Sequence, residues 1–308
     1  MKFIFMGTPE FAVPILERLN NLGEISLVVS QEDKRKGRGK KIKETPVKLK
    51  AQKLGLEVYQ PADINSEESI LKLKSQEADI IVVVAYGQIL NDEILKLGKK
   101  YIVNVHASLL PKLRGAAPIN RAIIEGFEKT GVSLMQVEKG LDSGGVSHVK
   151  EIYIDDMNAG QLEHKLSMLG ADLLEEFIKE AELEKINFIP QDDSQKTYAE
   201  KIDKNTLKLD FNNKSKDLVN QIRGLSPKYG ARFFYKDKLF KIYRAEIIEE
   251  NREIMPGTIL KSSNSFLIKT LDAAISVKEI QAPGKKVMNI EDFLRGNSFE
   301  KGYLIGGN

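Results

Sequence analysis

An unbroken β-branched run, Ile-Ile-Val-Val-Val at residues 80–84, sharply limits the folds available to this chain of 308 residues. A strand that is apolar at every position is buried on both faces, as strands are in parallel sheets covered by helices. Other apolar stretches, at 2–6, 25–29 and 101–105, alternate with segments of helical periodicity. The first half of the chain therefore predicts an α/β domain with a Rossmann-like, mostly parallel sheet.

The second half of the chain has a different pattern. Residues 187–205 form a polar stretch that includes Pro190, and we interpret it as a linker. Beyond it, a helical segment at 215–223 precedes short strand patterns separated by turn residues, which predict a small OB-like β-barrel. We thus expect a first domain at 1–186, a linker at 187–205 and a barrel domain at 206–308. The short strands are expected at 231–235, 238–245, 257–260, 266–270 and 274–280.

The composition excludes several classes of protein. The chain has no cysteine, which rules out disulfides, cysteine-ligated zinc and thiol nucleophiles. No apolar stretch approaches the roughly 20 residues of a membrane-spanning helix, and the apolar start at 2–6 is too short for a signal peptide. No cluster of residues has metal-ligand spacing. We therefore expect a cytoplasmic protein without a metal.

The charge of the chain is distributed unevenly. From Thr206 onward there are 18 Lys and Arg against 12 Asp and Glu, which gives this part a net charge of +6. Residues 1–205 have 29 Lys and Arg against 32 Asp and Glu, a net charge of −3, so the whole chain carries +3. Residues 34–50 also form a basic segment, with nine Lys or Arg and one Glu. Both features are typical of solvated surfaces, but flexible basic segments also order on phosphate backbones. They indicate an anionic macromolecule as a possible partner.

Asn104 and His106 occupy alternate positions at the end of the strand expected at 101–105. Alternate residues of a strand lie on one face, and parallel sheets bind ligands at the carboxyl ends of their strands. An amide can donate to a developing oxyanion, and a histidine can do the same or move a proton near neutral pH. Asp142, within a glycine-rich segment, could orient that imidazole. Each residue also has a structural interpretation, and their separation in sequence leaves the contact between His106 and Asp142 open.

Several motifs resemble those of one known family. Two are similar to signatures of the formyltransferases that use 10-formyltetrahydrofolate: Asn104-Val-His-Ala-Ser-Leu-Leu-Pro-Lys-Leu-Arg-Gly-Ala-Ala-Pro118 and Gly140-Leu-Asp-Ser-Gly144. Three others resemble the methionyl-tRNA formyltransferases within that group: Met6-Gly-Thr-Pro-Glu-Phe-Ala12, Gln281-Ala-Pro-Gly-Lys-Lys-Val-Met288 and Asp292-Phe-Leu-Arg-Gly296. The resemblance covers nearly the whole chain in the expected order. The family usually has an acidic residue where this chain has Gly145.

The resemblance implies a reaction and a set of site residues. The reaction is transfer of the formyl group of 10-formyltetrahydrofolate, a co-substrate, to the α-amine of methionyl initiator tRNA, by a monomer that requires no metal. The implied catalytic residues are Asn104, His106 and Asp142; the implied folate-binding residues are Ser108, Leu109, Leu110 and Pro111; the implied tRNA contacts are Arg38, Lys40 and Lys41. The basic C-terminal domain would hold tRNA phosphates, which position the RNA without reading its sequence.

Three other functions remain open at this point. A sugar-nucleotide amine formyltransferase shares the catalytic motifs and often the two-domain plan, although the basic segments favour tRNA as the acceptor. A glycinamide ribonucleotide formyltransferase fits less well, because it is typically a single domain. The chain could also be a tRNA-binding protein whose catalytic site has degenerated, but the presence of Asn104, His106 and Asp142 together argues against that interpretation.

Overall fold

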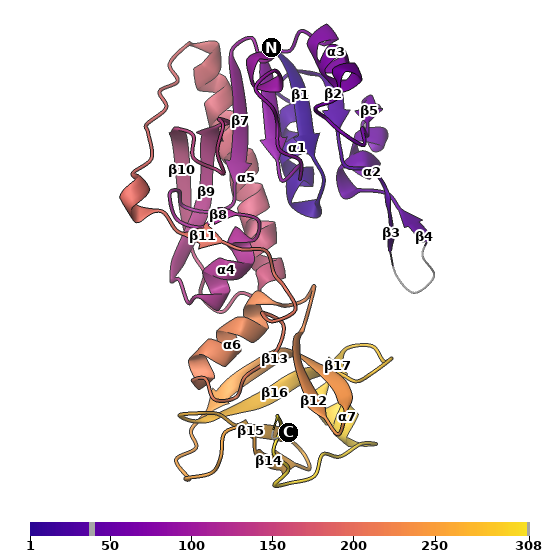
Figure 1. The fold of residues 1–308 in the computed structure, drawn as a ribbon, viewed down its shortest axis with the longest axis vertical. Helices are drawn as coiled ribbons and strands as arrows, with labels where there is room; N and C mark the ends of the chain where they lie inside the picture. Colours follow the sequence, from indigo (N-terminus) through magenta and orange to yellow (C-terminus); the bar gives the residue numbers. More distant parts are fainter. Residues whose placement is uncertain (37–40, 307–308) are drawn as a thin grey trace. The chain divides into compact units, whose positions relative to one another are not determined.

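The computed structural model describes residues 1–36 and 41–306, and the chain divides into two compact units (Figure 1). The second unit takes two earlier segments of the chain in addition to the C-terminal part. The first unit consists of Met1–Gly115, Thr130–Ile152 and Glu163–Tyr198, and the second consists of Ala116–Lys129, Tyr153–Leu162 and Ala199–Asn308.

A seven-stranded sheet forms the centre of the first unit, in the order β10-β9-β7-β6-β1-β2-β5. The neighbours from β7 to β5 are parallel, whereas β9 is antiparallel to β7. The predicted α/β domain with a mostly parallel sheet is therefore confirmed. The strands are β1 (Lys2–Gly7), β2 (Glu24–Val29), β5 (Val58–Tyr59), β6 (Ile80–Val84), β7 (Tyr101–His106), β9 (Lys129–Gln136) and β10 (Val146–Tyr153).

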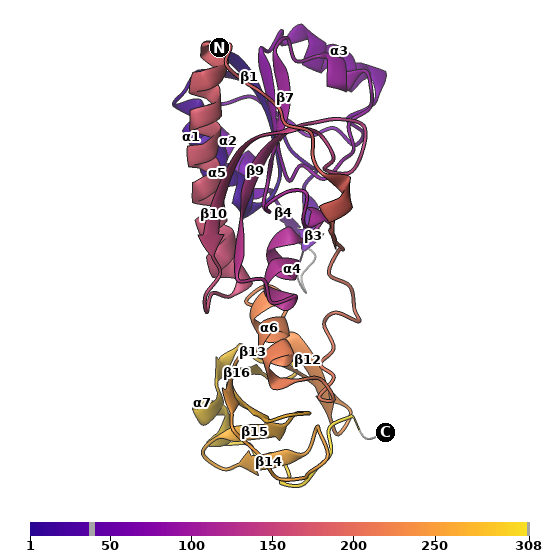
Figure 2. The ribbon, with the colours of Figure 1, turned by 90° about the vertical axis from the view of Figure 1, so that its left-hand side faces the viewer.

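Helices cover both faces of this sheet, which explains its continuously apolar strands (Figure 2). Ile4 and Met6 of β1 lie in one buried cluster with Leu73 of α3. On the other face α5 packs closely against β7. A Cβ added at Gly170 of α5 would lie only 3.0 Å from Cγ1 of Val105 in β7, so glycine permits this close approach. The helices of this unit are α1 (Val13–Asn20), α2 (Pro46–Lys53), α3 (Glu67–Ser75) and most of α5 (Ala159–Glu182), with 3-10 turns η1 (Glu10–Ala12), η2 (Ile94–Lys96) and η3 (Asp193–Gln195).

The connections of the sheet determine where a ligand site can form. The chain runs from β1 outward through β2 to β5, then returns to β6 and continues through β7 on the other side of β1. Open parallel sheets bind ligands outside the carboxyl ends of their strands, near such a reversal. His106 is the last residue of β7 and therefore lies at this edge.

The second unit is built on an antiparallel sheet in the order β12-β13-β16-β15-β14, with β17 added to β16. The sheet is curled into a half-barrel around a core of phenylalanines, in which the rings of Phe266 and Phe299 stack with centroids 4.2 Å apart. This arrangement confirms the expected small barrel-like β domain. Its elements are β12 (Ala231–Tyr235), β13 (Lys238–Ile248), β14 (Ile259–Ser262), β15 (Phe266–Lys269), β16 (Ala274–Gln281), β17 (Met288–Asn289), α4 (Pro118–Ile124), α6 (Ser215–Gly224) and α7 (Ile290–Leu294).

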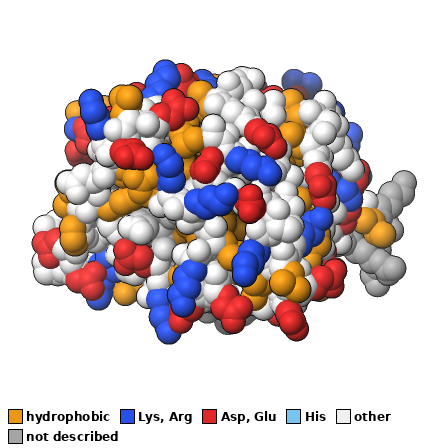
Figure 3. Space-filling view, turned by 90° about the horizontal axis from the view of Figure 1, so that it is seen from above, with side chains coloured by type: hydrophobic (Ala, Val, Ile, Leu, Met, Phe, Trp, Pro, Cys, Tyr) orange, Lys and Arg blue, Asp and Glu red, His pale blue; other side chains and the backbone are white. Residues whose placement is uncertain are grey.

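Two short strand pairs complete the structure. β3 (Lys34–Lys36) and β4 (Lys41–Lys43) form an antiparallel pair within the basic segment, and β8 (Arg114–Gly115) pairs with β11 (Tyr198–Ala199). On the end of the first unit that is uppermost in Figure 1, basic and acidic side chains are interspersed (Figure 3). Among the helices of residues 1–36 and 41–306, none is long and apolar enough to cross a membrane.

Candidate active site

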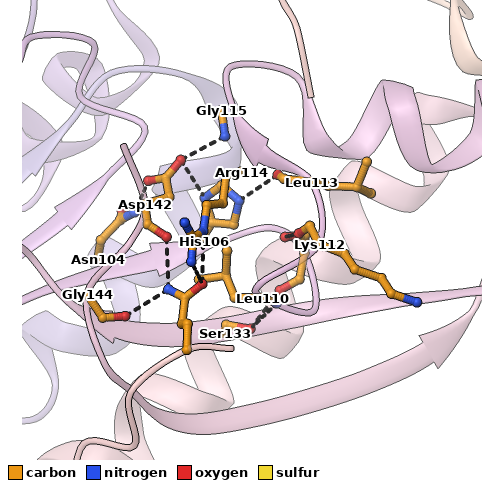
Figure 4. Close-up of polar contacts among 12 residues, drawn as sticks. Asn104, His106, Leu110, Lys112, Leu113, Arg114, Gly115, Ser133, Asp142 and Gly144 are labelled. Carbon is orange, nitrogen blue, oxygen red and sulfur yellow. Dashed lines mark hydrogen bonds and ion pairs between the residues drawn. The ribbon is translucent and has the colours of Figure 1, made fainter. Parts of the chain in front are cut away.

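β7 places Asn104 and His106 on one face at its carboxyl end. The strand lies between β6, where Val83 is opposite Asn104, and β9, where Ser133 is opposite His106. These neighbours on both sides fix the register of β7, so the two side chains project together (Figure 4). His106 is buried, with 6% of its surface exposed. The imidazole is therefore held in place and is not a freely rotating surface group.

The loop between β9 and β10 brings Asp142 to the same place. Its Oδ2 accepts a hydrogen bond from the backbone N–H of Gly115 at 2.8 Å and lies 3.6 Å from Nδ1 of His106. Its Oδ1 lies 3.5 Å from Nδ2 of Asn104. The structure thus brings together the three residues that the sequence singled out, across 36 positions between His106 and Asp142.

The contacts of His106 determine which ring nitrogen carries a proton. Nε2 lies 3.0 Å from the carbonyl oxygen of Leu113, and a carbonyl can only accept, so Nε2 donates. The neutral ring then has an unprotonated Nδ1 facing the carboxylate of Asp142. Only the imidazolium form donates from both nitrogens.

The distances within this trio leave the Asn104 amide and Nδ1 of His106 available to a ligand. Separations of 3.5 and 3.6 Å are longer than ordinary hydrogen bonds of these types. The amide of Asn104 and Nδ1 of His106 are therefore only weakly engaged with Asp142. Catalytic contacts in unliganded sites are often long and shorten when the substrate binds. The two groups can converge on one small polar atom.

Asp142 adopts a conformation that requires external support. Its φ is +48°, in the left-handed region that few residues other than glycine prefer. Gln191 provides that support: its Nε2 donates to the carbonyl oxygens of Asp142 at 2.9 Å and Gly144 at 2.8 Å. Its Oε1 in turn accepts from Nε and Nη2 of Arg114, at 3.0 and 2.7 Å. One amide side chain thus holds the loop at two points.

Arg114 completes this network. It is 3% exposed, and its charge is balanced by Asp193, with Nη2 2.8 Å from Oδ1. The hydrogen bond from Arg114 lowers the pKa of Asp193. Sequence reasoning assigned no role to Gln191, which falls in the expected linker, or to Arg114. No local pattern indicates either role, because the burial of Arg114 and its contact with Gln191 exist only in the folded chain.

The glycines of the Asp142 loop are required by close approach. A Cβ at Gly144 would lie 2.0 Å from the carbonyl oxygen of Gln136, and one at Gly145 would lie 3.0 Å from Cβ of Phe188. Phe188 packs against Tyr101 and Phe177. A larger residue at 145 would therefore require Phe188 to move, which explains in physical terms why glycine fits at this position.

The loop after β7 contains the four residues expected to contact folate. Ser108 is fully buried, and its hydroxyl donates to the carbonyl oxygen of Lys112 at 2.6 Å. Ser133 fixes the loop, since its Oγ accepts from the N–H of Leu110 at 3.1 Å and donates to the carbonyl oxygen of Ser108 at 2.8 Å. Leu109, Leu110 and Pro111 are partly exposed. The loop can therefore offer an apolar wall, whereas the hydroxyl of Ser108 is already used.

The basic segment is partly neutralised by its surroundings. Lys48 lies 2.5 Å from Asp33 and 3.1 Å from Glu44, and hydrogen bonding to Asp33 raises the pKa of Lys48. Lys50 pairs with Glu17 at 2.5 Å. Of the three expected tRNA contacts, Lys41 begins β4, whereas Arg38 and Lys40 lie outside the described residues. Residues 1–36 and 41–306 contain no group of three or more His, Asp or Glu placed to hold a metal ion.

Comparisons with known proteins agree with this architecture. Residues 1–178 match the family model of the formyl transferases, and residues 201–298 match the model of the formyl transferase C-terminal domain. A methionyl-tRNA formyltransferase of Clostridium novyi is 44% identical over 303 residues, which are 97% of this chain and 98% of that protein. This similarity extends through both units.

Two solved structures share the fold at low sequence identity. An N-formyltransferase of Helicobacter canadensis, in complex with folinic acid and dTDP-3-aminofucose, has a TM-score of 0.69 and 19% identity, and covers 92% of this chain and 99% of its own. HypX of Aquifex aeolicus, in complex with tetrahydrofolic acid, has a TM-score of 0.65 and 15% identity. The match covers all of this chain and 51% of HypX.

Proposed function

Because this chain belongs to the methionyl-tRNA formyltransferase family, we propose that it transfers a formyl group from a folate donor to the α-amine of methionyl-tRNA. The observation that carries this function is the convergence of Asn104, His106 and Asp142 at the carboxyl end of β7. Two hydrogen-bond donors and a carboxylate at one point suit acyl transfer, in which negative charge develops on a carbonyl oxygen.

The reaction follows from the chemistry of these groups. The amine nitrogen attacks the formyl carbon and forms the new C–N bond, and the formyl oxygen of the tetrahedral intermediate becomes an oxyanion. Asn104 Nδ2 and the protonated Nδ1 of His106 donate to that oxygen. The intermediate collapses by breaking the bond between the formyl carbon and N10 of the donor. The proton lost by the amine passes to N10, and Asp142 assists this transfer, directly or through water.

The donor is 10-formyltetrahydrofolate, which carries its formyl group on a nitrogen that leaves readily once protonated. Leu109, Leu110 and Pro111 form one wall of its site, because their side chains are partly exposed in the loop that directly follows β7. Ser108 contributes by shaping the loop through its bond to Lys112.

The acceptor is the methionylated initiator tRNA. Arg38, Lys40 and Lys41 of the basic segment contact the acceptor-stem end of that tRNA, and the basic character of the C-terminal region adds phosphate contacts. A monomer suffices for this reaction, and the enzyme works in the cytoplasm, where the tRNA is charged. A sugar-nucleotide amine is a less suitable acceptor, since it gives the basic segment no polyanion to bind.

One assay tests this function. The protein is incubated with 10-formyltetrahydrofolate labelled in the formyl group, and with either methionylated initiator tRNA or a sugar-nucleotide amine. We expect the label on the RNA. Transfer to the sugar amine alone would replace the proposed acceptor. Binding of tRNA without transfer to either acceptor would show instead that the site is catalytically inactive.

A further inference from the structure

The orientation of the His106 ring depends on one backbone carbonyl. The carbonyl oxygen of Leu113 lies 3.0 Å from Nε2 of His106, and both residues are buried, with 2% of Leu113 and 6% of His106 exposed. Because this carbonyl accepts the proton on Nε2, the ring takes up its second proton at Nδ1, the nitrogen that faces Asp142. The position of Leu113 therefore determines which nitrogen of His106 is offered to the reacting atoms.

Leu113 holds this position in an unfavourable backbone conformation. Its φ is +60°, in the left-handed region that residues with a side chain rarely adopt. Such conformations persist only where the surrounding structure holds them, and they cluster at functional sites. Two residues further on, the N–H of Gly115 donates to Oδ2 of Asp142 at 2.8 Å (Figure 4). Residues 113–115 thus contact both His106 and Asp142, so an anchor for this segment steadies both.

Thr197 anchors this segment from a distant part of the chain. Its Oγ1 accepts from the N–H of Leu113 at 2.9 Å, across 84 positions in the sequence. Its carbonyl oxygen accepts from the N–H of Arg114 at 2.9 Å, and its own N–H donates to the carbonyl oxygen of Pro111 at 3.4 Å. The last two bonds join backbone atoms and are open to any residue but proline at 197. Only the bond to Leu113 requires a hydroxyl.

The surroundings of Thr197 offer little other use for its side chain. The residue is exposed, so its methyl group adds little to a buried core. Without Oγ1, the N–H of the buried Leu113 would lose its acceptor, and a buried donor without a partner is costly. The left-handed turn would then relax. This anchor is separate from Gln191, which supports Asp142 through its backbone carbonyl.

We propose that Thr197 is a positioning residue for formyl transfer, which acts on His106 through the backbone of Leu113. Its hydroxyl keeps the Leu113 carbonyl at Nε2, and the ring then presents Nδ1 to the formyl oxygen. When the hydroxyl is removed, the carbonyl moves away from Nε2 and the neutral ring also populates the tautomer with its proton on Nδ1. The effect on catalysis rests on the proposed function, whereas the effect on the ring does not.

The test compares matched variants of the full chain. Thr197→Val keeps the branched shape and removes the hydroxyl, and Thr197→Ser keeps the hydroxyl and removes the methyl group. Ser194→Ala is the control, because this exposed serine of the same segment donates its hydroxyl to Asp192 at 2.7 Å. Formyl transfer to methionyl initiator tRNA gives kcat and KM, and thermal unfolding shows that each variant is folded.

NMR of isotope-labelled ring nitrogens reports the tautomer of His106 directly, at a pH at which the rings are neutral. The chain has only three histidines, and His106→Gln identifies the signals of that ring by their loss. This measurement needs neither folate nor tRNA. It also separates a change at the His106 ring from a general loss of structure, which would alter the signals of His148 and His164 as well.

We expect Thr197→Val to lower kcat on the order of tenfold with KM for tRNA unchanged, since a small displacement of a catalytic group is enough for such a loss. The His106 ring should change from the Nε2–H tautomer to a mixture of both. Thr197→Ser and Ser194→Ala should behave like the unmodified protein in both measurements. If Thr197→Val does not fold, Thr197→Ala removes the same hydroxyl and should show the same two changes.

The inference would be overturned by an unchanged kcat and an unchanged tautomer in Thr197→Val. Equal losses in the valine and serine variants would show that the methyl group matters and not the hydroxyl. A lower kcat with the His106 tautomer unchanged would also contradict it, because the effect would not pass through Leu113. If the unmodified protein transfers no formyl group but Thr197→Val still alters the ring, the proposed function fails and the link from Thr197 to His106 stands.

Discussion

Gln191 donates through Nε2 to the backbone carbonyl oxygen of Asp142 at 2.9 Å, and so connects the segment after α5 to the loop between β9 and β10. Asp142 holds its carboxylate 3.6 Å from Nδ1 of His106 with its backbone in a left-handed conformation. Arg114 holds Gln191 from the other side through two hydrogen bonds. The position of Asp142, the proposed proton-transfer group, therefore depends on Gln191, which lies outside the motifs that contain the trio.

Replacing Gln191 should slow the reaction without weakening tRNA binding. Gln191→Leu keeps the volume but removes both donors to the Asp142 loop and the acceptor of Arg114. Misplacement of a catalytic group by about 1 Å costs up to about 100-fold, so we expect kcat to fall between about 10- and 100-fold while KM for tRNA changes little. Gln195→Leu, at an exposed position of the same segment, is the control. An unchanged kcat, or equal losses in both variants, would contradict the positioning role.

Substitutions in the trio should reduce turnover more strongly. His106→Gln removes the imidazole and Asp142→Asn removes the carboxylate charge, and asparagine tolerates the left-handed backbone at position 142. Loss of one oxyanion donor typically costs about 100- to 1,000-fold, and we expect at least that loss in single-turnover formylation. His164→Gln, on an exposed face of α5, serves as the control. Near-normal transfer by either trio variant would remove that residue from the mechanism.

The basic segment should affect the acceptor and not the donor. We expect Arg38→Ala to lower kcat/KM for methionyl-tRNA, because alanine cannot donate to a phosphate as arginine does. Hydrolysis of the formyl donor in the absence of tRNA should remain as in the unmodified protein. Lys50→Ala is a suitable control, since Lys50 is already paired with Glu17. If tRNA kinetics do not vary between 50 and 200 mM salt, the phosphate-contact model is wrong.

The like charges of Arg232 and Lys241, which lie opposite each other on β12 and β13, have a consequence for stability. Burial and the charge of Arg232 lower the pKa of Lys241, so the charged lysine destabilises the fold. This penalty is full below the lowered pKa and disappears as the pH rises to the unfolded value near 10.5. Lys241→Gln should therefore increase the free energy of unfolding at neutral pH, by about 0.2–1 kcal/mol, at the lower end because solvent screens the pair.

Thermal unfolding followed by circular dichroism measures this effect. The melting temperature of Lys241→Gln should exceed that of the unmodified protein at pH 7, and the difference should shrink as the pH approaches 10.5. Lys278→Gln breaks an attractive pair with Glu246 and should not raise the melting temperature. A lower melting temperature of Lys241→Gln at pH 7 would show that Lys241 stabilises the folded state, contrary to our interpretation.

Much of the first unit could be predicted because its signals are local. The run at 80–84 indicated a strand buried on both faces, and it is β6 in the middle of the sheet. The alternation of Asn104 and His106 placed both on one face of β7. Packing between segments that are distant in sequence could not be predicted from such local patterns. The segment at 116–129 packs with the second unit, and the domain limits at 186 and 206 stay a prediction.

Periodicity and motif order were enough to indicate the sheet, the barrel-like domain, the family and the candidate trio, because each depends on neighbours along the chain. Three relationships could be recognised only in the folded chain. They are the contact of Asp142 with His106, the hydrogen bonds from Gln191 to the Asp142 loop, and the lateral alignment of Lys208, Arg232 and Lys241. Each of these depends on the register of strands and the path of loops that join residues far apart in sequence. Periodicity indicates the face of a residue, whereas register and loop path determine which residue lies beside it.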